Sequence, residues 1–449
     1  MATDTAPQTA QTAQTGRPQL ASPGPVLAAS LIGFFVIALD ALVVNVALPA
    51  IGDSVHGGMA GLQWVVTGYT LMFAALMLSA GSLSDRIGAK RAYGSGLALF
   101  TAASVLCGLA PQLWLLVAAR MVQGAAAALM LPASLALIRQ AYPDTARRAR
   151  AIAVWTTGGA VAAAAGPVAG GLLTGLWGWR TIFFINVPAG VVGLLLLSRT
   201  ARSPKRPAPL DLPGQLTGAL TLASLTYAVI ETSLAALAVT VLAAAAFLAV
   251  EARRPNPMVP LGLFRSRTVS LAVVAGFAVN GAFYGAIFLL SLSFQEGRGQ
   301  SALAAGLMFV PMTAVVALVN YFGAVRLTAR FGPRTMIAAG QLGTVAGLLA
   351  LLATDSHTPA ALVSALMIPV GFAGALAVTP LTALLLDNVP ADRAGTAAGV
   401  FNTARQAGGA VAVAAFGSMA LRTSLLVAAA ALVATTVATI ALLRPIKGR

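Results

Sequence analysis

Apolar residues are gathered in runs of about twenty that recur along the whole chain and are separated by short polar connectors. The runs lack the alternation of a membrane-spanning strand, so each predicts a helix. An even number of such helices places both chain ends on the same side of a membrane. We expect fourteen, at about 26–51, 62–83, 92–110, 112–138, 150–176, 180–198, 212–231, 234–251, 268–293, 301–325, 334–353, 359–384, 394–419 and 422–443.

The composition indicates that lipid is the surrounding solvent. Of the 449 residues, 58% are hydrophobic and 9% are charged, whereas a soluble domain carries about 25% charged residues. A bilayer admits helical bundles and closed barrels, and the length of the runs favours helices. We therefore predict an all-α integral membrane protein. Residues 1–24, rich in Thr, Gln, Ala and Pro, predict a disordered cytoplasmic tail.

The net charge of +16 suggests either a nucleic-acid partner or a membrane orientation. With the N-terminus in the cytoplasm, Arg180, Arg298 and Arg422 fall in outer connectors, and Arg120 and Arg405 fall within apolar runs. Every other Lys and Arg lies on the inner side, as the positive-inside rule requires. Orientation in the lipid bilayer therefore explains the charge, and we expect no nucleic-acid partner.

The sequence predicts no metal site and no cofactor. Cys107 is the single cysteine and lies inside an apolar run, which is typical of a core thiol. The two histidines, His56 and His357, lie far apart in polar connectors. No spacing of potential ligands matches a metal site.

Two connectors indicate an internal duplication. The loop at 81–91 reads Gly-Ser-Leu-Ser-Asp-Arg-Ile-Gly-Ala-Lys-Arg, and the loop at 328–334 reads Thr-Ala-Arg-Phe-Gly-Pro-Arg, with Ala329 where the first has Asp85. Related halves around a central cavity are typical of secondary transporters. We divide the chain into a six-helix bundle at 25–200, a two-helix insertion at 211–252 and a second, pseudo-symmetric six-helix bundle at 265–443.

Five motifs follow one another on the first six predicted helices. They are Leu-Asp-Ala-Leu-Val-Val-Asn-Val-Ala-Leu-Pro at 39–49, the 81–91 loop, Arg-Met-Val-Gln-Gly at 120–124, Gly-Pro-Val-Ala-Gly-Gly at 166–171 and Trp-Arg-Thr-Ile-Phe-Phe-Ile-Asn-Val-Pro-Ala-Gly at 179–190. Together they resemble the drug:proton antiporters of the major facilitator superfamily, in their fourteen-helix branch, over nearly the whole chain. One departure is Ala162, where that branch usually has glycine.

The resemblance implies a secondary active transporter, not an enzyme, that exports small hydrophobic or amphipathic drugs and antibiotics in exchange for protons by alternating access. It implies a multi-pass monomer in a bacterial-type cytoplasmic membrane, with both termini cytoplasmic. It further implies that the 81–91 loop is a cytoplasmic latch and that the 166–171 segment directs antiport, although a plain basic loop and small-residue packing are the simpler interpretations. The gating residues would be Gly81, Asp85, Arg86, Gly88, Gly166, Pro167, Gly170 and Gly171.

Asp40 is the only acid deep inside an apolar run, so it is the candidate for proton coupling. Burial favours its neutral form, a nearby cation favours its carboxylate, and competition between the two lets a carboxyl group load and release a proton. Arg120 lies at a similar predicted depth and cannot lose its proton. It either controls the protonation of Asp40 or forms a fixed salt bridge with it. Gln123 lies on the same helical face as Arg120.

Other polar residues within apolar runs are candidates for substrate contact, with interhelical packing as the alternative for each. Asn280 and Tyr284 share one helical face, as do Asn402 and Arg405. The predicted substrate-binding set is Tyr69, Gln123, Asn280, Tyr284, Asn320, Asn402 and Arg405.

Three rivals to an exporter stay open from the sequence. An importer or proton symporter of a small metabolite would share the fold, but the 166–171 segment and the fourteen helices argue against it. A non-transporting membrane sensor would not need Asp40 with Arg120. A membrane enzyme would need a nucleophile and base or a metal cluster, and no such set is found.

Overall fold

The computed structural model describes residues 23–205, 207, 210–355, 357–390 and 393–443. Within these residues the chain forms helices and connectors without a strand. Of the predicted disordered tail, residues 1–22 lie outside the described part. The first half comprises α1 (Pro23–Val55), α2 (Met59–Ile87), α3 (Ala89–Leu109), α4 (Leu113–Ala141), α5 (Thr145–Trp177), α6 (Thr181–Phe184) and α7 (Asn186–Ser198).

The rest of the chain begins with a hairpin of α8 (Leu212–Ile230) and α9 (Leu234–Arg253). Each of the fourteen predicted runs is helical, but several are divided into shorter pieces, with breaks at Ile185, Phe309, Gly323, Met367 and Phe372. The second half comprises η1 (Leu261–Arg265), α10 (Arg267–Leu292), η2 (Ser293–Gly297), α11 (Ala302–Met308), α12 (Val310–Phe322), α13 (Ala324–Phe331), α14 (Pro333–Leu352), α15 (Ala360–Leu366), η3 (Ile368–Gly371), η4 (Ala373–Ala377), α16 (Val378–Asp387), α17 (Ala394–Gly417) and α18 (Leu421–Leu442).

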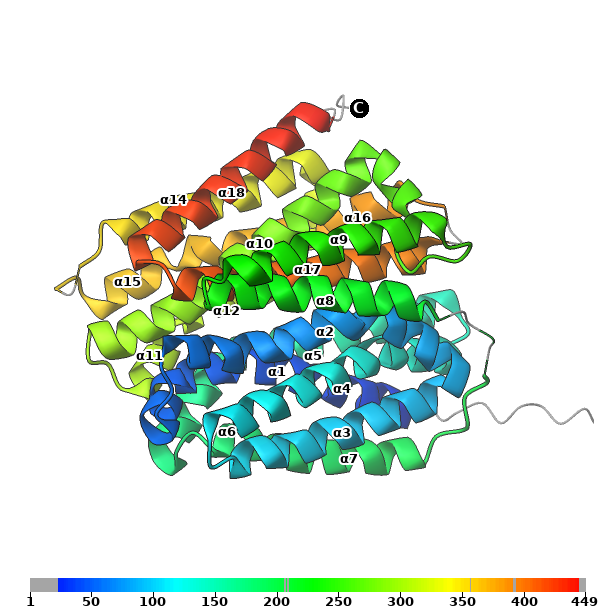
Figure 1. The fold of residues 1–449 in the computed structure, drawn as a ribbon, viewed down its shortest axis with the longest axis horizontal. Helices are drawn as coiled ribbons and strands as arrows, with labels where there is room; N and C mark the ends of the chain where they lie inside the picture. The colour runs from blue at the N-terminus through cyan, green and yellow to red at the C-terminus, as the bar shows by residue number, and fades with distance from the viewer. Residues whose placement is uncertain (1–22, 206, 208–209, 356, 391–392, 444–449) are drawn as a thin grey trace, which may run out of the picture.

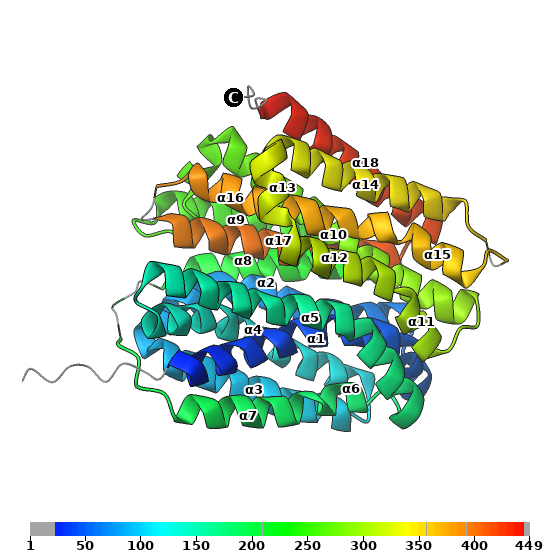
Figure 2. The ribbon, with the colours of Figure 1, turned by 180° about the vertical axis from the view of Figure 1, so that it is seen from behind.

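The helices form two groups that lie one above the other in Figure 1, with α1 to α7 below and α10 to α18 above. The α8–α9 hairpin lies along the junction on the near face, where α8 contacts both α2 and α17. On the opposite face, shown in Figure 2, α5 contacts α11 and α12. Across the same junction, α1 contacts α10 and α2 contacts α17. Both halves therefore contribute walls to one shared interface.

Within the described residues, twelve helical segments are long and apolar enough to cross a membrane, and α8 and α17 are not among them. The predicted all-helical membrane fold is thus confirmed, whereas the number of fourteen spans stays a prediction. The centre of α17 carries Asn402, Thr403, Arg405 and Gln406. A helix this polar at its centre needs neighbouring helices or water rather than lipid around that stretch.

The two halves repeat one backbone turn. Gly88 alone separates α2 from α3, with φ 90° and ψ 134°, and Gly332 separates α13 from α14 with φ 80° and ψ 156°. Both φ values lie where only glycine is unstrained. The loop predicted at 81–91 is wrong in extent, because residues 81–87 continue α2. A helix can continue beyond the membrane with polar residues, so the end of an apolar run is not the end of the helix.

Candidate functional site

Asp40 and Arg120 form an ion pair in the interior of the first half. Asp40 lies near the middle of α1 and Arg120 in the first third of α4. Nη1 of Arg120 donates a hydrogen bond to Oδ2 of Asp40, and the two side chains are 1% and 0% exposed, respectively. The structure therefore brings together the acid and the cation that the sequence singles out.

The other carboxylate oxygen of Asp40 is held by two amides. Nδ2 of Asn186 donates to Oδ1 at 2.9 Å, and Nε2 of Gln123 donates to the same atom at 3.3 Å. Both amide groups also donate to Oγ of Ser104, at 3.3 Å and 2.7 Å. These donors, together with Arg120, stabilise the ionised form of the acid.

Arg120 has a second set of partners that does not depend on Asp40. Its Nε donates to the Val65 carbonyl at 3.1 Å, and its Nη1 donates to Oε1 of Gln123 at 2.9 Å. Its Cζ lies 4.4 Å from the centre of the Tyr69 ring, whose hydroxyl donates to the Ile37 carbonyl at 3.2 Å. The guanidinium therefore keeps favourable contacts when the acid is neutral.

A second cluster lies in the other half, on α10 and α17. Nε and Nη2 of Arg405 both donate to Oδ1 of Asn280, at 3.2 Å and 3.1 Å, and Nη1 donates to Oδ1 of Asn402 at 3.4 Å. Nδ2 of Asn280 donates to Oε1 of Gln406 at 3.3 Å. Asn280 is buried, while the other three are partly exposed. The predicted residues Asn280, Asn402 and Arg405 thus lie together, joined by Gln406.

Tyr284 lies on α10, one helical turn from Asn280. It packs against Gly409 of α17, where an added Cβ would lie 3.3 Å from its Cδ2. Asn320 is different, because it is exposed near the end of α12 and belongs to neither cluster. The sequence predicts a substrate contact for each of these residues, whereas the structure places Asn320 away from both clusters.

The two halves are hydrogen-bonded to each other at the predicted outer ends of their helices. Nε2 of Gln63 donates to the Ala414 carbonyl at 2.7 Å, Oγ of Ser291 donates to the Asn45 carbonyl at 2.8 Å, and Nε2 of Gln295 donates to the Val46 carbonyl at 2.9 Å. These bonds hold the two halves together on that side. At the opposite end, Asp85 and Arg86 are both exposed.

The glycines of the 166–171 segment permit backbone contact on two sides of α5. A Cβ added to Gly166 would lie 2.9 Å from Cβ of Leu42, and one added to Gly170 would lie 2.6 Å from the Val43 carbonyl oxygen. On the other side, a Cβ added to Gly171 would lie 2.8 Å from Cα of Leu303. The segment therefore joins α1, the helix of Asp40, to α11 of the other half, and α5 continues as a helix through Pro167.

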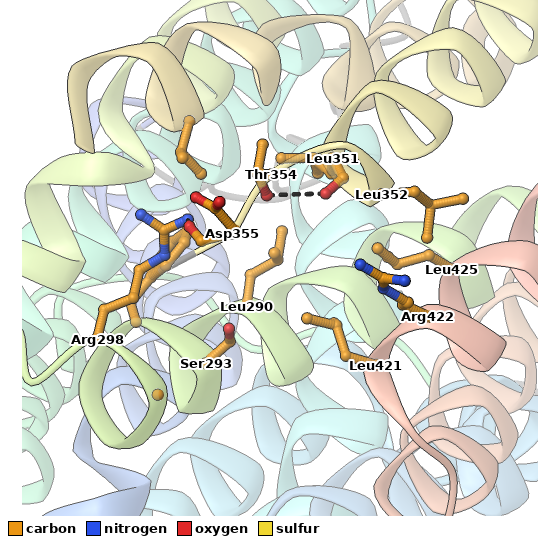
Figure 3. A pocket seen from close by; sticks show the side chains of 13 residues that line it. Leu290, Ser293, Arg298, Leu351, Leu352, Thr354, Asp355, Leu421, Arg422 and Leu425 are labelled. Atoms are coloured by element: carbon orange, nitrogen blue, oxygen red, sulfur yellow. Dashed lines mark hydrogen bonds between the residues drawn. The ribbon is translucent and has the colours of Figure 1, made fainter. Parts of the chain in front are cut away.

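A pocket of about 170 Å³ opens at the predicted outer end of the second half. Figure 3 shows Arg298 and Asp355 on one side of it and Arg422 on the other, with leucines between them. Arg298 donates to the Thr358 carbonyl at 2.7 Å. None of the residues in the two polar clusters lines this pocket.

The comparison with known families decides the class of this protein. Residues 30–413 match the sequence model of the Major Facilitator Superfamily. The chain belongs to the Major Facilitator Superfamily. It is accordingly a transporter and not an enzyme, and the resemblance inferred from the five motifs is confirmed at the level of the family.

Curated relatives of this superfamily transporter are named for resistance. It is 39% identical over 407 residues to "Multidrug resistance protein Stp" of Mycobacterium tuberculosis, covering 88% of this chain and 75% of that protein. It is 38% identical over 428 residues to "Methylenomycin A resistance protein" of Streptomyces coelicolor, covering 93% and 90%. The crystal structure of a D-xylose-proton symporter aligns with a TM-score of 0.71 at 15% identity, covering 95% and 99%, which shows the shared fold.

Sequence reasoning missed three members of the transporter's first cluster. Asn186 is part of the 179–190 motif but has no predicted role, and nothing in the sequence singles out Ser104. Cys107 is predicted to be a core thiol; it is buried, and its Sγ donates to Oε1 of Gln123 at 3.2 Å. Each is a single polar residue within an apolar run, and this pattern could have marked it as a candidate. The pattern does not indicate which residue on another helix each one contacts.

Proposed function

We propose that this transporter is a proton-coupled antiporter that exports small hydrophobic or amphipathic molecules, including drugs and antibiotics, across a bacterial-type cytoplasmic membrane. The observation that carries the proposal is the buried Asp40–Arg120 pair with its amide donors. Relatives named for resistance to several drugs and to methylenomycin A support antibiotics as substrates. We further propose a monomer with both termini cytoplasmic, built from the bundles at 25–200 and 265–443 and the insertion at 211–252.

Protonation of Asp40 is the proposed coupling step. A proton on the carboxyl group removes its negative charge, while Arg120 keeps its own charge and its bonds to Val65 and Gln123. The ion pair between α1 and α4 is then lost, and an uncompensated cation is left in the interior. Such a change in charge favours a different packing of the helices. Proton uptake from outside would displace substrate, and proton release toward the cytoplasm would restore substrate affinity.

The described conformation fits a state that is closed toward the outside. The three hydrogen bonds at the outer ends join the halves, whereas Asp85 at the inner end is exposed. We assign Gly81, Asp85, Arg86 and Gly88 to a latch that engages when the inner side closes. The close contacts of Gly166, Gly170 and Gly171 in α5 would transmit movement of α1 to the second half.

Inverted vesicles test both direction and coupling. An exporter accumulates substrate inside them and releases protons from their lumen, whereas a proton symporter carries substrate and protons out of the lumen together. We expect Asp40→Asn to abolish this exchange while the protein is still inserted. Asp53→Asn is the matched control, because Asp53 lies on the same helix and is exposed. Undiminished proton-coupled export by Asp40→Asn would refute the proposal.

A further inference from the structure

Arg405 is a fixed positive charge at the middle of α17. The helix extends about 16 Å from it toward Ala394 and about 18 Å toward Gly417. Arginine is not neutralised by losing a proton. A charge at this depth in a membrane therefore has to be compensated by other groups. The identity of those groups indicates the function of the site.

The acids of this chain do not supply that compensation. Asp40 is the only acid deep inside an apolar run, and its carboxylate is already held by Arg120 and two amides. Among the residues that the structure describes, the other ion pair joins Arg254 to Asp211. Within the same residues, the partners of Arg405 are the neutral amide oxygens of Asn280 and Asn402.

Within the described part of the chain, the guanidinium of Arg405 has N–H groups that no protein acceptor uses. It carries five N–H groups, and its three hydrogen bonds occupy one on each of Nε, Nη1 and Nη2. One N–H on each Nη atom is left for a ligand. A planar carboxylate is the acceptor that matches a guanidinium with two oxygen atoms.

The site is partly exposed and lies beside aromatic side chains. Arg405, Asn402, Gln406 and Tyr284 are each partly exposed, whereas Arg120 is 1% exposed. Polar groups exposed at this depth face a space between helices rather than lipid. The Phe401 ring lies 5.8 Å from Cζ of Arg405. A carboxylate would meet the guanidinium here, and an apolar body attached to it would meet the partly exposed Tyr284, which lies on the same helix as Asn280.

We propose that Arg405, Asn280 and Asn402 form a subsite for an anionic group, and that the exported molecules include amphipathic organic acids whose carboxylate pairs with Arg405. This assignment rests on the proposed function and specifies its substrate class. Gln406 acts as a positioning residue, because its Oε1 accepts from Nδ2 of Asn280 and thereby turns the oxygen of that amide toward Arg405.

Binding of benzoate tests the subsite without knowledge of the natural substrate. The purified full-length protein would be heated at pH 7.5 with rising concentrations of sodium benzoate or of benzamide, its neutral isostere. We expect benzoate to raise the unfolding midpoint at least threefold more than benzamide does. The difference should disappear in Arg405→Gln and persist in Asp40→Asn. Equal shifts for both compounds, or an undiminished difference in Arg405→Gln, would overturn the subsite.

A second variant and a salt control complete the test. Asn280→Asp places a carboxylate beside Arg405 and should therefore abolish the benzoate effect. This variant keeps the test available if Arg405→Gln fails to fold. Sodium chloride at the same concentrations should give no comparable shift. A chloride effect as large as that of benzoate would assign the site to an inorganic anion and overturn the assignment to an organic acid.

Export measurements separate this proposal from the proposed function. In inverted vesicles, Arg405→Gln should reduce transport of carboxylate-bearing substrates at least fivefold and leave that of neutral substrates within twofold. If Asp40→Asn still couples export to protons, the antiport mechanism fails while the benzoate result continues to decide the subsite. If acids and neutral compounds lose transport equally in Arg405→Gln, the subsite fails and antiport stands.

Discussion

Arg120 and Arg405 are the two arginines within the apolar runs, and they are compensated in opposite ways. Arg120 is almost fully buried and paired with Asp40. Arg405 is partly exposed and held by the amide oxygens of Asn280 and Asn402. The first cluster thus contains a charge that a proton can cancel. The second contains a charge that only another molecule can cancel, which makes the first suited to coupling and the second to binding.

The largest expected effect is on stability and comes from removing the partner of Arg120. Asp40→Ala leaves a buried cation without its counter-charge, which costs about 3–5 kcal/mol. Arg405→Ala removes hydrogen bonds to neutral amides, one of them buried, which costs about 1–3 kcal/mol. Unfolding of both variants in detergent, followed by tryptophan fluorescence, measures the difference. Similar costs for the two variants would break the comparison.

A double variant sharpens this result. Asp40→Leu combined with Arg120→Met removes both charges and should recover much of the lost stability, because a buried pair is costly to desolvate. The double variant should still lack proton-coupled export. Recovery of stability together with export would mean that the pair is structural.

The amides give the second expected difference. Asn186 donates to the Asp40 carboxylate at 2.9 Å in a buried setting, so Asn186→Leu should cost about 2 kcal/mol, as for a bond to a charged group. Asn402 accepts from Arg405 at 3.4 Å and is partly exposed, so Asn402→Leu should cost under about 1 kcal/mol. Paired unfolding curves compare them. A larger cost for Asn402→Leu would contradict the contrast in burial.

The order and type of the helices were predictable, because runs of apolar residues and the distribution of Arg and Lys are read directly from the chain. Asp40 and Arg120 were also identifiable, since a charge in an apolar run is rare. The contacts were not. Asn186 contacts Asp40 although the two are distant in sequence. Asn320 and Asn280 are both asparagines within apolar runs, yet only Asn280 contacts Arg405. Facing directions depend on helix rotation and packing, which one sequence does not specify.

Glycines beside each arginine predict a third, smaller difference. An added Cβ at Gly124 would lie 2.9 Å from the carbonyl carbon of Tyr69, so Gly124→Ala forces two backbones apart and should cost about 1–3 kcal/mol. At Gly276 the nearby atoms belong to the side chains of Phe401 and Arg405, which can move, so Gly276→Ala should cost less. Gly175→Ala is the control, with nothing within 4 Å. Unfolding curves would contradict this if Gly276→Ala were the costlier change.

The smallest expected effect concerns Asp355, an exposed acid that belongs to neither cluster. Hydrogen bonds from the Thr358 hydroxyl at 2.9 Å and the Thr358 N–H at 2.8 Å lower the pKa of Asp355 below its ordinary value of 3.8. Because the folded pKa is the lower one, the stabilisation is complete above the ordinary pKa and is lost as pH falls through the lowered value. Hydrogen exchange of the Thr358 amide should show this loss below about pH 4, and Asp355→Asn should remove the pH dependence. The effect should be the same in Asp40→Asn, because a carboxylate in contact with bulk water titrates without any conformational change. A dependence on Asp40 would mean that the outer pocket and the first cluster are coupled.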